Sequence, residues 1–274
     1  MEIKMLRIWM FFLVSVLNVF AQARNQAAPL PVSACLNQAP WGMPASKVQV
    51  QVICRRGYVT ANDLNARLPK WVSYTLTPAN ALGCIPRTNA FAVDQSLPPG
   101  QRATPQDYAG TGYDMGHNAP DGDMSWDMQV ELESFLMSNM MPQLPGLNRG
   151  IWKLLETATR GWAVQRGHTL QVVSGPIYFY NNPTIGANRV IVPHAFYKVI
   201  LDTQTREAMG FWFHHQGGQG NDLTRVRKSI VEIQLATGLE FQFPPNSVEV
   251  PLNQIWPVDY GQLTNAKRSV CRVQ

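Results

Sequence analysis

Short runs of alternating or β-branched residues recur along the chain and predict a set of strands. Polar and apolar residues alternate in "KVQVQVIC" at residues 47–54, which is typical of a half-buried strand. "WVSYTL" at residues 71–76 is rich in aromatic and β-branched side chains, and similar composition predicts strands at "TLQVVSG", "RVIVP", "FYKVILD" and "MGFWFHH". The segment between the first two strands contains an Asn-Asp pair and a proline, so residues 55–70 are expected to form a hairpin loop.

A helical spacing of apolar residues predicts one long helix in "LNRGIWKLLETATRGWAVQ", residues 147–165. Its apolar face comprises Ile151, Leu154, Leu155, Ala158 and Trp162. "RKSIVEIQLATG" predicts a second helix ending at Gly238, and Ser125 is expected to cap a short helix that runs to about residue 137. Strands and helices do not alternate strictly, so the pattern predicts an α+β fold in which helices flank a mostly antiparallel central sheet.

The N-terminus has the pattern of a secretory signal peptide. Lys4 and Arg7 precede a mostly apolar run at residues 8–20, and "AQA" at residues 21–23 supplies a small-residue cleavage pattern. The run is shorter than the roughly 20 residues that span a bilayer, which disfavours the alternative of an uncleaved anchor. The expected organisation is a signal peptide at 1–23, an irregular segment at 24–46 and a single domain at 47–274, in a secreted or periplasmic protein.

Charge and cysteine content narrow the class of protein further. The chain has 23 basic and 18 acidic side chains, and this mildly basic balance permits a polyanionic substrate without proving one. Four cysteines in an exported chain predict two disulfides, and their spacing matches no zinc motif. Three pairings are open; the expected closeness of the first two strands suggests Cys54–Cys84 with Cys35–Cys271.

The stretch "GYDMGHNAPDGDMSWD", residues 112–127, contains four aspartates, three glycines and one histidine, with few apolar residues. It predicts an exposed polar turn that carries His117. A histidine in such a turn has a pKa near neutrality, which suits a general base, and the glycine before it lets the backbone turn sharply. The alternative is a turn histidine without a catalytic role.

The long predicted helix supplies a candidate metal site. Asn148 and Glu156 are eight residues apart, which in a regular helix separates them by about 80° and about 12 Å, so they cannot easily bind one ion directly. One amide oxygen together with several waters is a common way to hold Mg²⁺, and Glu156 could meet those waters. Arg160, one turn further on, could pair with Glu156 or with a phosphate.

Taken together, "YDMGHNAP" and "SNMMPQLPGLNRGIWKLLE" resemble the signature of the DNA/RNA non-specific endonucleases, the ββα-metal or His-Me finger family. The resemblance extends upstream to "WVSYTLTPAN" and "PRTNAFAVD", and downstream to "VVSGPIY", "VPHAFYKVILD" and "SIVEIQLATGLEF". It covers roughly residues 50–241 and implies a ββα-metal finger active site within the α+β fold.

The resemblance implies a role for each residue that matches a family motif. His117 matches the general base that takes a proton from the attacking water. Asn148 matches the single protein ligand of Mg²⁺, for which Mn²⁺ is an expected substitute, and Glu156 matches the acidic residue that holds the metal's waters. Asn139 matches an asparagine that supports the site.

Arginines complete the expected site, with one departure from the family pattern. Arg87 and Arg160 match arginines that contact phosphate or stabilise developing charge. The family commonly has an arginine where this chain has Met115, which puts the catalytic rate in doubt. Arg102 or Arg149 could compensate.

The expected activity is hydrolysis of phosphodiester bonds in DNA and RNA, with 5′-phosphate products and low sequence selectivity. The alternative is a catalytically weakened protein of the same fold that binds nucleic acid, with Met115 as the cause. The sequence leaves open whether the chain acts as a monomer or a homodimer.

Overall fold

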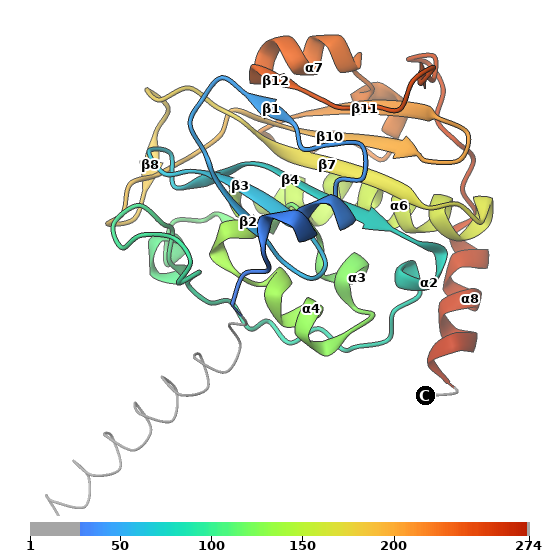
Figure 1. Cartoon of the computed structure of the whole chain (residues 1–274), viewed down its shortest axis with the longest axis horizontal. Coiled ribbons are helices and arrows are strands. Elements are labelled where there is room, and N and C mark those ends of the chain that lie inside the picture. Colours follow the sequence, from blue (N-terminus) through green and yellow to red (C-terminus); the bar gives the residue numbers. More distant parts are fainter. Residues whose placement is uncertain (1–27, 273–274) are drawn as a thin grey trace, which may run out of the picture.

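The computed structural model describes residues 28–272, so the expected signal peptide at 1–23 lies outside the described residues. Seven strands form one central sheet in the order β13-β11-β10-β7-β4-β3-β2 (Figure 1). Their bounds are β2 Gln51–Cys54, β3 Val59–Asp63, β4 Leu68–Leu76, β7 Leu170–Ile177, β10 Ala195–Asp202, β11 Glu207–His214 and β13 Val248–Glu249. Neighbours are antiparallel except β11 and β13, which confirms the α+β prediction with a mostly antiparallel sheet.

Helices cover both faces of this sheet. Figure 1 shows α7 (Ile230–Thr237) on one side and α6 (Lys153–Arg166) with α8 (Tyr260–Cys271) on the other. The remaining α-helices are short: α2 (Pro78–Ala81), α3 (Asp121–Met124), α4 (Met128–Ser134) and α5 (Pro145–Leu147). Helical turns of other types are η1 (Val32–Asn37), η2 (Pro105–Tyr108), η3 (Met137–Asn139), η4 (Asn148–Trp152) and η5 (Leu223–Val226).

Three small antiparallel pairs complete the fold. They are β1 (Ala45–Ser46) with β12 (Leu239–Glu240), β5 (Asp114–His117) with β6 (Met140–Gln143), and β8 (Thr184–Ile185) with β9 (Val190–Ile191). Because β1 and η1 both lie before residue 47, the described part of the segment expected to be irregular contains some regular structure. None of the described helices is both long enough and apolar enough to cross a membrane.

The alternation of side chains along β10 shows why the sheet is buried on both faces. Phe196 and Ile200 belong to the core beneath α6, whereas Tyr197, Val199 and Leu201 belong to the core beneath α7. Successive strand residues point to opposite faces, so one strand serves two cores. Helix α6 contributes Leu155, Ala158 and Trp162 to the first core, which confirms the predicted apolar face.

Three predicted elements differ from the structure. The expected hairpin loop at residues 55–70 contains strand β3, whose polar end is satisfied internally: Asp63 accepts hydrogen bonds from Tyr178 and Tyr180. The first predicted strand is shorter than expected, because β2 begins at Gln51. The helix expected to start at Ser125 is α4, which is capped by Asp127 through the amides of residues 129 and 130 and ends at residue 134.

The predicted long helix is interrupted near its start. Residues 148–152 form a wide π-type turn, and Gly150 has non-helical angles of φ −99° and ψ −119°. The regular helix α6 begins only at Lys153. The regular-helix estimate of the separation between Asn148 and Glu156 therefore does not apply, because the chain kinks between them.

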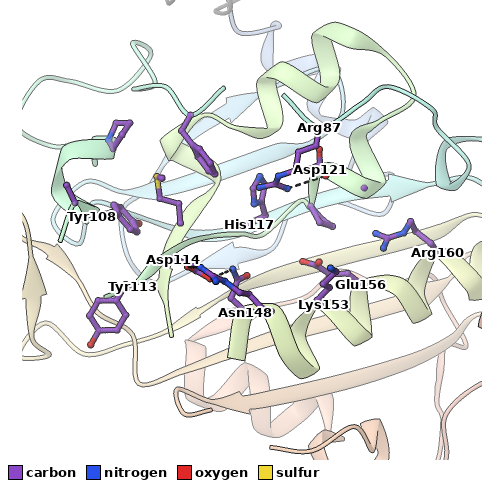
Figure 2. A pocket seen from close by; sticks show the side chains of 17 residues that line it. Arg87, Tyr108, Tyr113, Asp114, His117, Asp121, Asn148, Lys153, Glu156 and Arg160 are labelled. Carbon is purple, nitrogen blue, oxygen red and sulfur yellow. Dashed lines mark hydrogen bonds and ion pairs between the residues drawn. The ribbon is translucent and has the colours of Figure 1, made fainter. Parts of the chain in front are cut away.

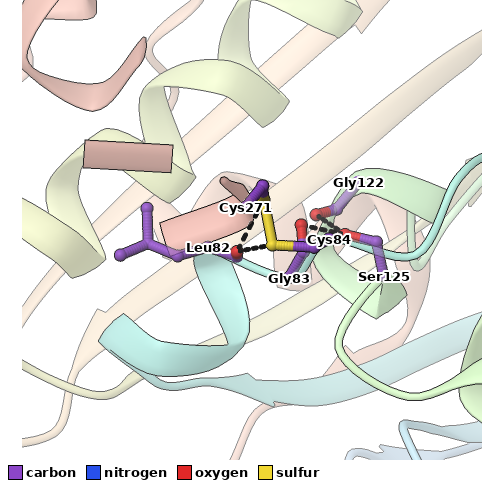
Figure 3. The surroundings of a disulfide bond; sticks show 6 residues. All are labelled: Leu82, Gly83, Cys84, Gly122, Ser125 and Cys271. Atoms are coloured by element: carbon purple, nitrogen blue, oxygen red, sulfur yellow. Dashed lines mark hydrogen bonds between the residues drawn. A yellow bond between two sulfur atoms is a disulfide. The ribbon is translucent and has the colours of Figure 1, made fainter. Parts of the chain in front are cut away.

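The suggested disulfide pairing is wrong. The structure pairs Cys35 with Cys54 and Cys84 with Cys271, at Cα–Cα distances of 5.1 and 5.4 Å. The turn η1 folds back beside β2, where Leu30 donates its amide to the Cys54 carbonyl, and this brings Cys35 to Cys54. Cys84 follows α2 and meets the last turn of α8 instead (Figure 3).

Removal of each disulfide is expected to destabilise the protein by a different amount. Replacing Cys84 and Cys271 by alanine opens a loop of sequence separation 187 and should lower the free energy of unfolding by about 4–5 kcal/mol. The matched double variant of Cys35 and Cys54, with separation 19, should lose about 3 kcal/mol. Guanidinium denaturation measures both losses, and a larger loss for the shorter loop would contradict the prediction.

Candidate active site

An open cleft of about 800 Å³ lies between α6 and the β5–α3 segment. Figure 2 shows Asn148, Glu156 and Arg160 along one side of it, and His117, Arg87 and Asp121 along the other. Five of the six predicted site residues therefore line one cleft; the sixth, Asn139, lies behind its wall. Strands β5 and β6 followed by α6 supply the expected two-strand and helix arrangement.

His117 is a buried strand residue, and the expectation of an exposed turn is wrong. It ends β5, opposite Met140 of β6, and only 7% of its surface is exposed. Its ring lies 5.0 Å from the Phe135 ring and 5.9 Å from the Phe91 ring, measured between centroids. The glycine before it is required by close packing, since a Cβ at Gly116 would lie 1.9 Å from an oxygen of Gln143.

The surroundings of His117 keep its imidazole neutral. Burial, together with the positive charges of Arg87 and Lys198, lowers the pKa of His117 to about 3. Its Nε2 atom is buried and has no hydrogen-bond partner among residues 28–272. A neutral imidazole can accept a proton at physiological pH, and a bound anionic phosphodiester would favour the protonated product.

Asn148 is held in one orientation by an aspartate of the polar stretch. Its Nδ2 atom donates to Asp114 Oδ2 at 2.9 Å, and Arg149 donates to both oxygens of the same carboxylate at 2.9 and 2.6 Å. Burial by itself raises the pKa of Asp114, but the hydrogen bonds from Arg149 and Asn148 lower it below its usual value. The amide nitrogen is thus occupied, and the amide oxygen is the atom left for a ligand.

The donor set fits a hard cation held mainly through water. Within residues 28–272, no group of three or more His, Cys, Asp or Glu side chains could enclose a metal. The cleft instead offers one oriented side-chain amide oxygen, from Asn148, and the carboxylate of Glu156, because the other two carboxylates in its lining, Asp114 and Asp121, pair with Arg149 and Arg87. Mg²⁺ accepts such a site because it keeps several of its waters.

The pKa of the Glu156 carboxyl is raised well above its ordinary value. Burial raises the pKa of its carboxyl to about 7, and Asp123 adds to this effect, whereas the positive charges of Lys198 and Arg160 oppose it. Lys198 lies on β10 under the cleft and is fully buried, with its ammonium 4.6 Å from the centroid of the Trp152 ring. Its charge therefore favours both a neutral His117 and an ionised Glu156.

The two predicted arginines are each positioned by an aspartate. Arg87 contacts Asp121 at 3.2 Å and lies over the Phe135 ring, with 44% of its side chain exposed. Arg160 is more buried and donates to Asp123 at 2.7 Å. A Cβ at residue 122 would lie 2.7 Å from the Arg160 guanidinium, so a side chain at this position would displace Arg160.

Asn139 stabilises the cleft from behind. Its side chain accepts the amide of Ala119 at 2.9 Å and donates to the carbonyls of Ala119 and Ser134, both at 2.8 Å. It is fully buried and fixes the backbone that follows His117. Asn139 does not line the cleft, so it acts by positioning the backbone next to His117.

A model of the DNA/RNA non-specific endonuclease family matches residues 42–247, which is most of the chain. The chain belongs to this family. It is 34% identical over 202 residues to a nuclease of Nostoc sp. (strain PCC 7120 / SAG 25.82 / UTEX 2576), and this match covers 69% of the chain and 72% of the relative. It is 30% identical over 267 residues to the mitochondrial nuclease EXOG of Xenopus laevis, covering 91% and 74% respectively.

Solved structures agree with the assignment to this endonuclease family. A crystal structure described as the EndoG/EndoGI complex is similar with a TM-score of 0.69 and 26% sequence identity, over 84% of this chain and 95% of that chain. The chain is also 31% identical to human mitochondrial endonuclease G over 174 residues, which is 60% of this chain and 57% of that protein.

Four charged residues in or beside the cleft were not assigned a role from sequence. Three of them are aspartates that hold cleft residues in place by hydrogen bonds or ion pairs: Asp114, Asp121 and Asp123. The fourth, Lys198, lowers the pKa of Glu156 through its positive charge. The density of aspartates in the polar stretch was the available signal for the first three. No local pattern marks Lys198, because it sits in an otherwise apolar strand.

The raised pKa of Glu156 predicts a stability effect in the metal-free protein. A carboxyl whose pKa rises from 4.5 to about 7 on folding destabilises the fold as pH increases, with no cost below pH 4.5 and the full cost above pH 7. Glu156→Gln should therefore raise the free energy of unfolding by about 3 kcal/mol at pH 8 and change it little at pH 4. Chemical denaturation in EDTA measures this difference, and a variant that is less stable at pH 8 would contradict the prediction.

Proposed function

We propose that this protein is an exported, Mg²⁺-dependent endonuclease that hydrolyses phosphodiester bonds of both DNA and RNA to 5′-phosphate products. The observation that carries the proposal is the convergence of His117, Asn148 and Glu156 on one cleft with two arginines. Among the residues that the structure describes, the cleft is open at the surface, which suits a long polymer entering from the side. Membership of the non-specific endonuclease family supports the same substrate class.

His117 acts as the general base in this proposal. A water between its ring and the phosphate loses a proton to the neutral imidazole while its oxygen attacks phosphorus. The bond from phosphorus to the 3′-oxygen breaks and that oxygen takes up a proton from solvent water, so the products are a 5′-phosphate and a 3′-hydroxyl. Phe91 and Phe135 hold the ring in place on two sides, which limits its rotation away from the water.

Arg87 and Arg160 bind the phosphate oxygens and stabilise the charge that develops on them. Both guanidiniums are fixed by aspartates before substrate arrives, so little reorganisation is needed. Asn148 and Glu156 would hold Mg²⁺ and its waters, and the bound ion would stabilise negative charge at phosphorus and on the leaving oxygen. These contacts involve phosphate rather than base edges, so low sequence selectivity follows.

Export is supported by the pattern of residues 1–23 and by two disulfides among the described residues. Disulfides persist mainly in oxidising compartments such as the periplasm or the extracellular medium. Several relatives are named as mitochondrial proteins, and those names describe the location of the relatives.

Analysis of the product ends tests the proposed reaction. Fragments of plasmid DNA and of RNA cut by the chain from Arg24 onward are expected to carry 5′-phosphates, so that a ligase joins the DNA fragments without prior phosphorylation. Sequencing of the ends should show little base preference. Ends that carry 3′-phosphates, or cutting at one short sequence only, would exclude the proposal.

Met115 supports a second candidate, a protein that binds nucleic acid and cuts it weakly. Its half-buried side chain lines the cleft where the family commonly has an arginine. Arg102 cannot replace that arginine, because it bonds to the Asp94 and Leu97 carbonyls and does not reach the cleft. Arg149 lines the cleft and is the better substitute.

Met115→Arg is expected to raise kcat/KM by about tenfold, because a charged hydrogen bond to phosphate contributes roughly 1.5 kcal/mol or more. The slope of log affinity against log salt should steepen by about one. Met115→Leu is the matched control and should leave both quantities near the wild-type values. An arginine variant that behaves like the leucine variant would show that this position does not limit the enzyme.

A further inference from the structure

A second groove, of about 380 Å³, opens between α6 and the C-terminal helix α8. Gly122 and Arg160 line both this groove and the active cleft, so the two are continuous. Lys267 and Arg268 of α8 line the far side of the groove. Helix α8 lies beyond the family match, which ends at residue 247.

The α8 side of the groove carries positive charge, from Lys267 and Arg268. Helix α8 contains no aspartate or glutamate, and neither Lys267 nor Arg268 forms an ion pair with any residue from 28 to 272. The nearest acidic groups are already engaged, because Asp123 binds Arg160 and Asp121 binds Arg87. Burial and the charge of Arg160 lower the pKa of Lys267, whereas the charges of Asp121 and Asp123 raise it, and a phosphate bound beside Lys267 would favour its charged form.

Helix α8 is anchored along its length, so the backbone that carries Lys267 and Arg268 is held beside the groove. At its start, Asp259 exchanges two hydrogen bonds with Gln165 of α6, at 2.6 and 3.0 Å. Leu263 is buried against the rest of the protein. At its end, Cys271 is bonded to Cys84, and the Ser125 hydroxyl bonds to Gly83 and Gly122 beside that disulfide (Figure 3).

We propose that this groove binds a phosphate of the nucleic-acid strand next to the scissile one, with Lys267 and Arg268 as its cationic contacts. The inference rests on the proposed function, since Arg160 marks where the scissile phosphate lies. A nucleic-acid strand presents phosphates at regular intervals, so a strand held at Arg160 carries its next phosphates past the groove. An acidic protein partner would not need continuity with the cleft.

Binding of a single-stranded oligonucleotide of about 20 nucleotides tests the groove. The double variant Lys267→Gln/Arg268→Gln is built on His117→Ala and measured in EDTA, so that no cutting occurs. Its Kd at about 0.1 M salt should rise by about tenfold, and the salt slope should fall by about two. The matched control is Arg225→Gln/Lys228→Gln, which removes two positive charges that line neither the groove nor the active cleft.

Cleavage by the same variants in the wild-type background separates this inference from the proposed function. The loss of kcat/KM on the oligonucleotide should exceed the loss on a dinucleotide by about tenfold, because a dinucleotide is too short to reach the groove. Equal losses on both substrates, or equal effects of the control pair, would show that the groove does not bind a neighbouring phosphate. The proposed nuclease activity would not be affected by that result. No cutting by the wild type would instead overturn the nuclease, while the binding measurement would still decide the groove.

Discussion

Replacing His117 by alanine is expected to lower kcat on both DNA and RNA by about 10²–10⁴-fold, the usual contribution of a positioned general base. The affinity for substrate should change little, because the phosphate contacts are assigned to Arg87 and Arg160. The imidazole is buried and neutral, with a pKa of about 3, so no acidic limb from His117 is expected between pH 5 and 8. Steady-state rates and Kd values on both substrates measure these effects.

His214→Ala is the matched control for the base, because His214 is exposed at the end of β11 and does not line the cleft. It should keep the wild-type rate. A His117 variant that retained more than a tenth of kcat, or one that lost affinity in proportion to rate, would show that His117 is not the base.

The second large effect is expected at Asn148. Asn148→Ala removes the only side-chain amide oxygen among the described residues that line the cleft, so kcat/KM should fall by about 10²–10³-fold. The Mg²⁺ concentration for half-maximal rate should rise by at least about tenfold. Titration of activity with Mg²⁺ gives both numbers, and Asn253→Ala on an exposed segment is the control.

Asn148→Asp separates the ligand role from the hydrogen bond to Asp114. This variant keeps an oxygen for the metal but replaces the donor to Asp114 with a second carboxylate. If the oxygen holds the metal, Asn148→Asp should retain far more Mg²⁺-dependent activity than Asn148→Ala. Equal losses in the two variants would mean that Asn148 acts only through Asp114.

The sheet was predictable where local composition and burial agree. Strands β4, β7, β10 and β11 are rich in apolar and aromatic residues, and each was found near its predicted position. Strand β3 was missed because Asn62 and Asp63 look like loop residues, although both are buried and hydrogen-bonded. The buried position of Asp63 depends on partners far along the chain, such as Tyr178, which a local sequence pattern does not indicate.

The residues of the candidate site could be predicted from the sequence, but their burial and their packing partners could not. The resemblance indicated His117, Asn148 and Glu156, and the fold brings them to one cleft. It did not indicate the burial of His117, because Phe91 and Phe135 come from segments with no recognisable link to it. The kink at residue 150 and the disulfide pairing likewise depend on how distant elements pack.

Metal-dependent phosphodiester cleavage at this cleft can be measured in a single assay. Plasmid DNA and RNA are incubated with the chain from Arg24 onward, with Mg²⁺ or with EDTA, beside His117→Ala. We expect cutting of both nucleic acids with Mg²⁺, little cutting with EDTA, and a loss of at least about 100-fold in the variant. Salt-sensitive binding of nucleic acid without cutting by the wild type would contradict this expectation and favour the weakened binding protein.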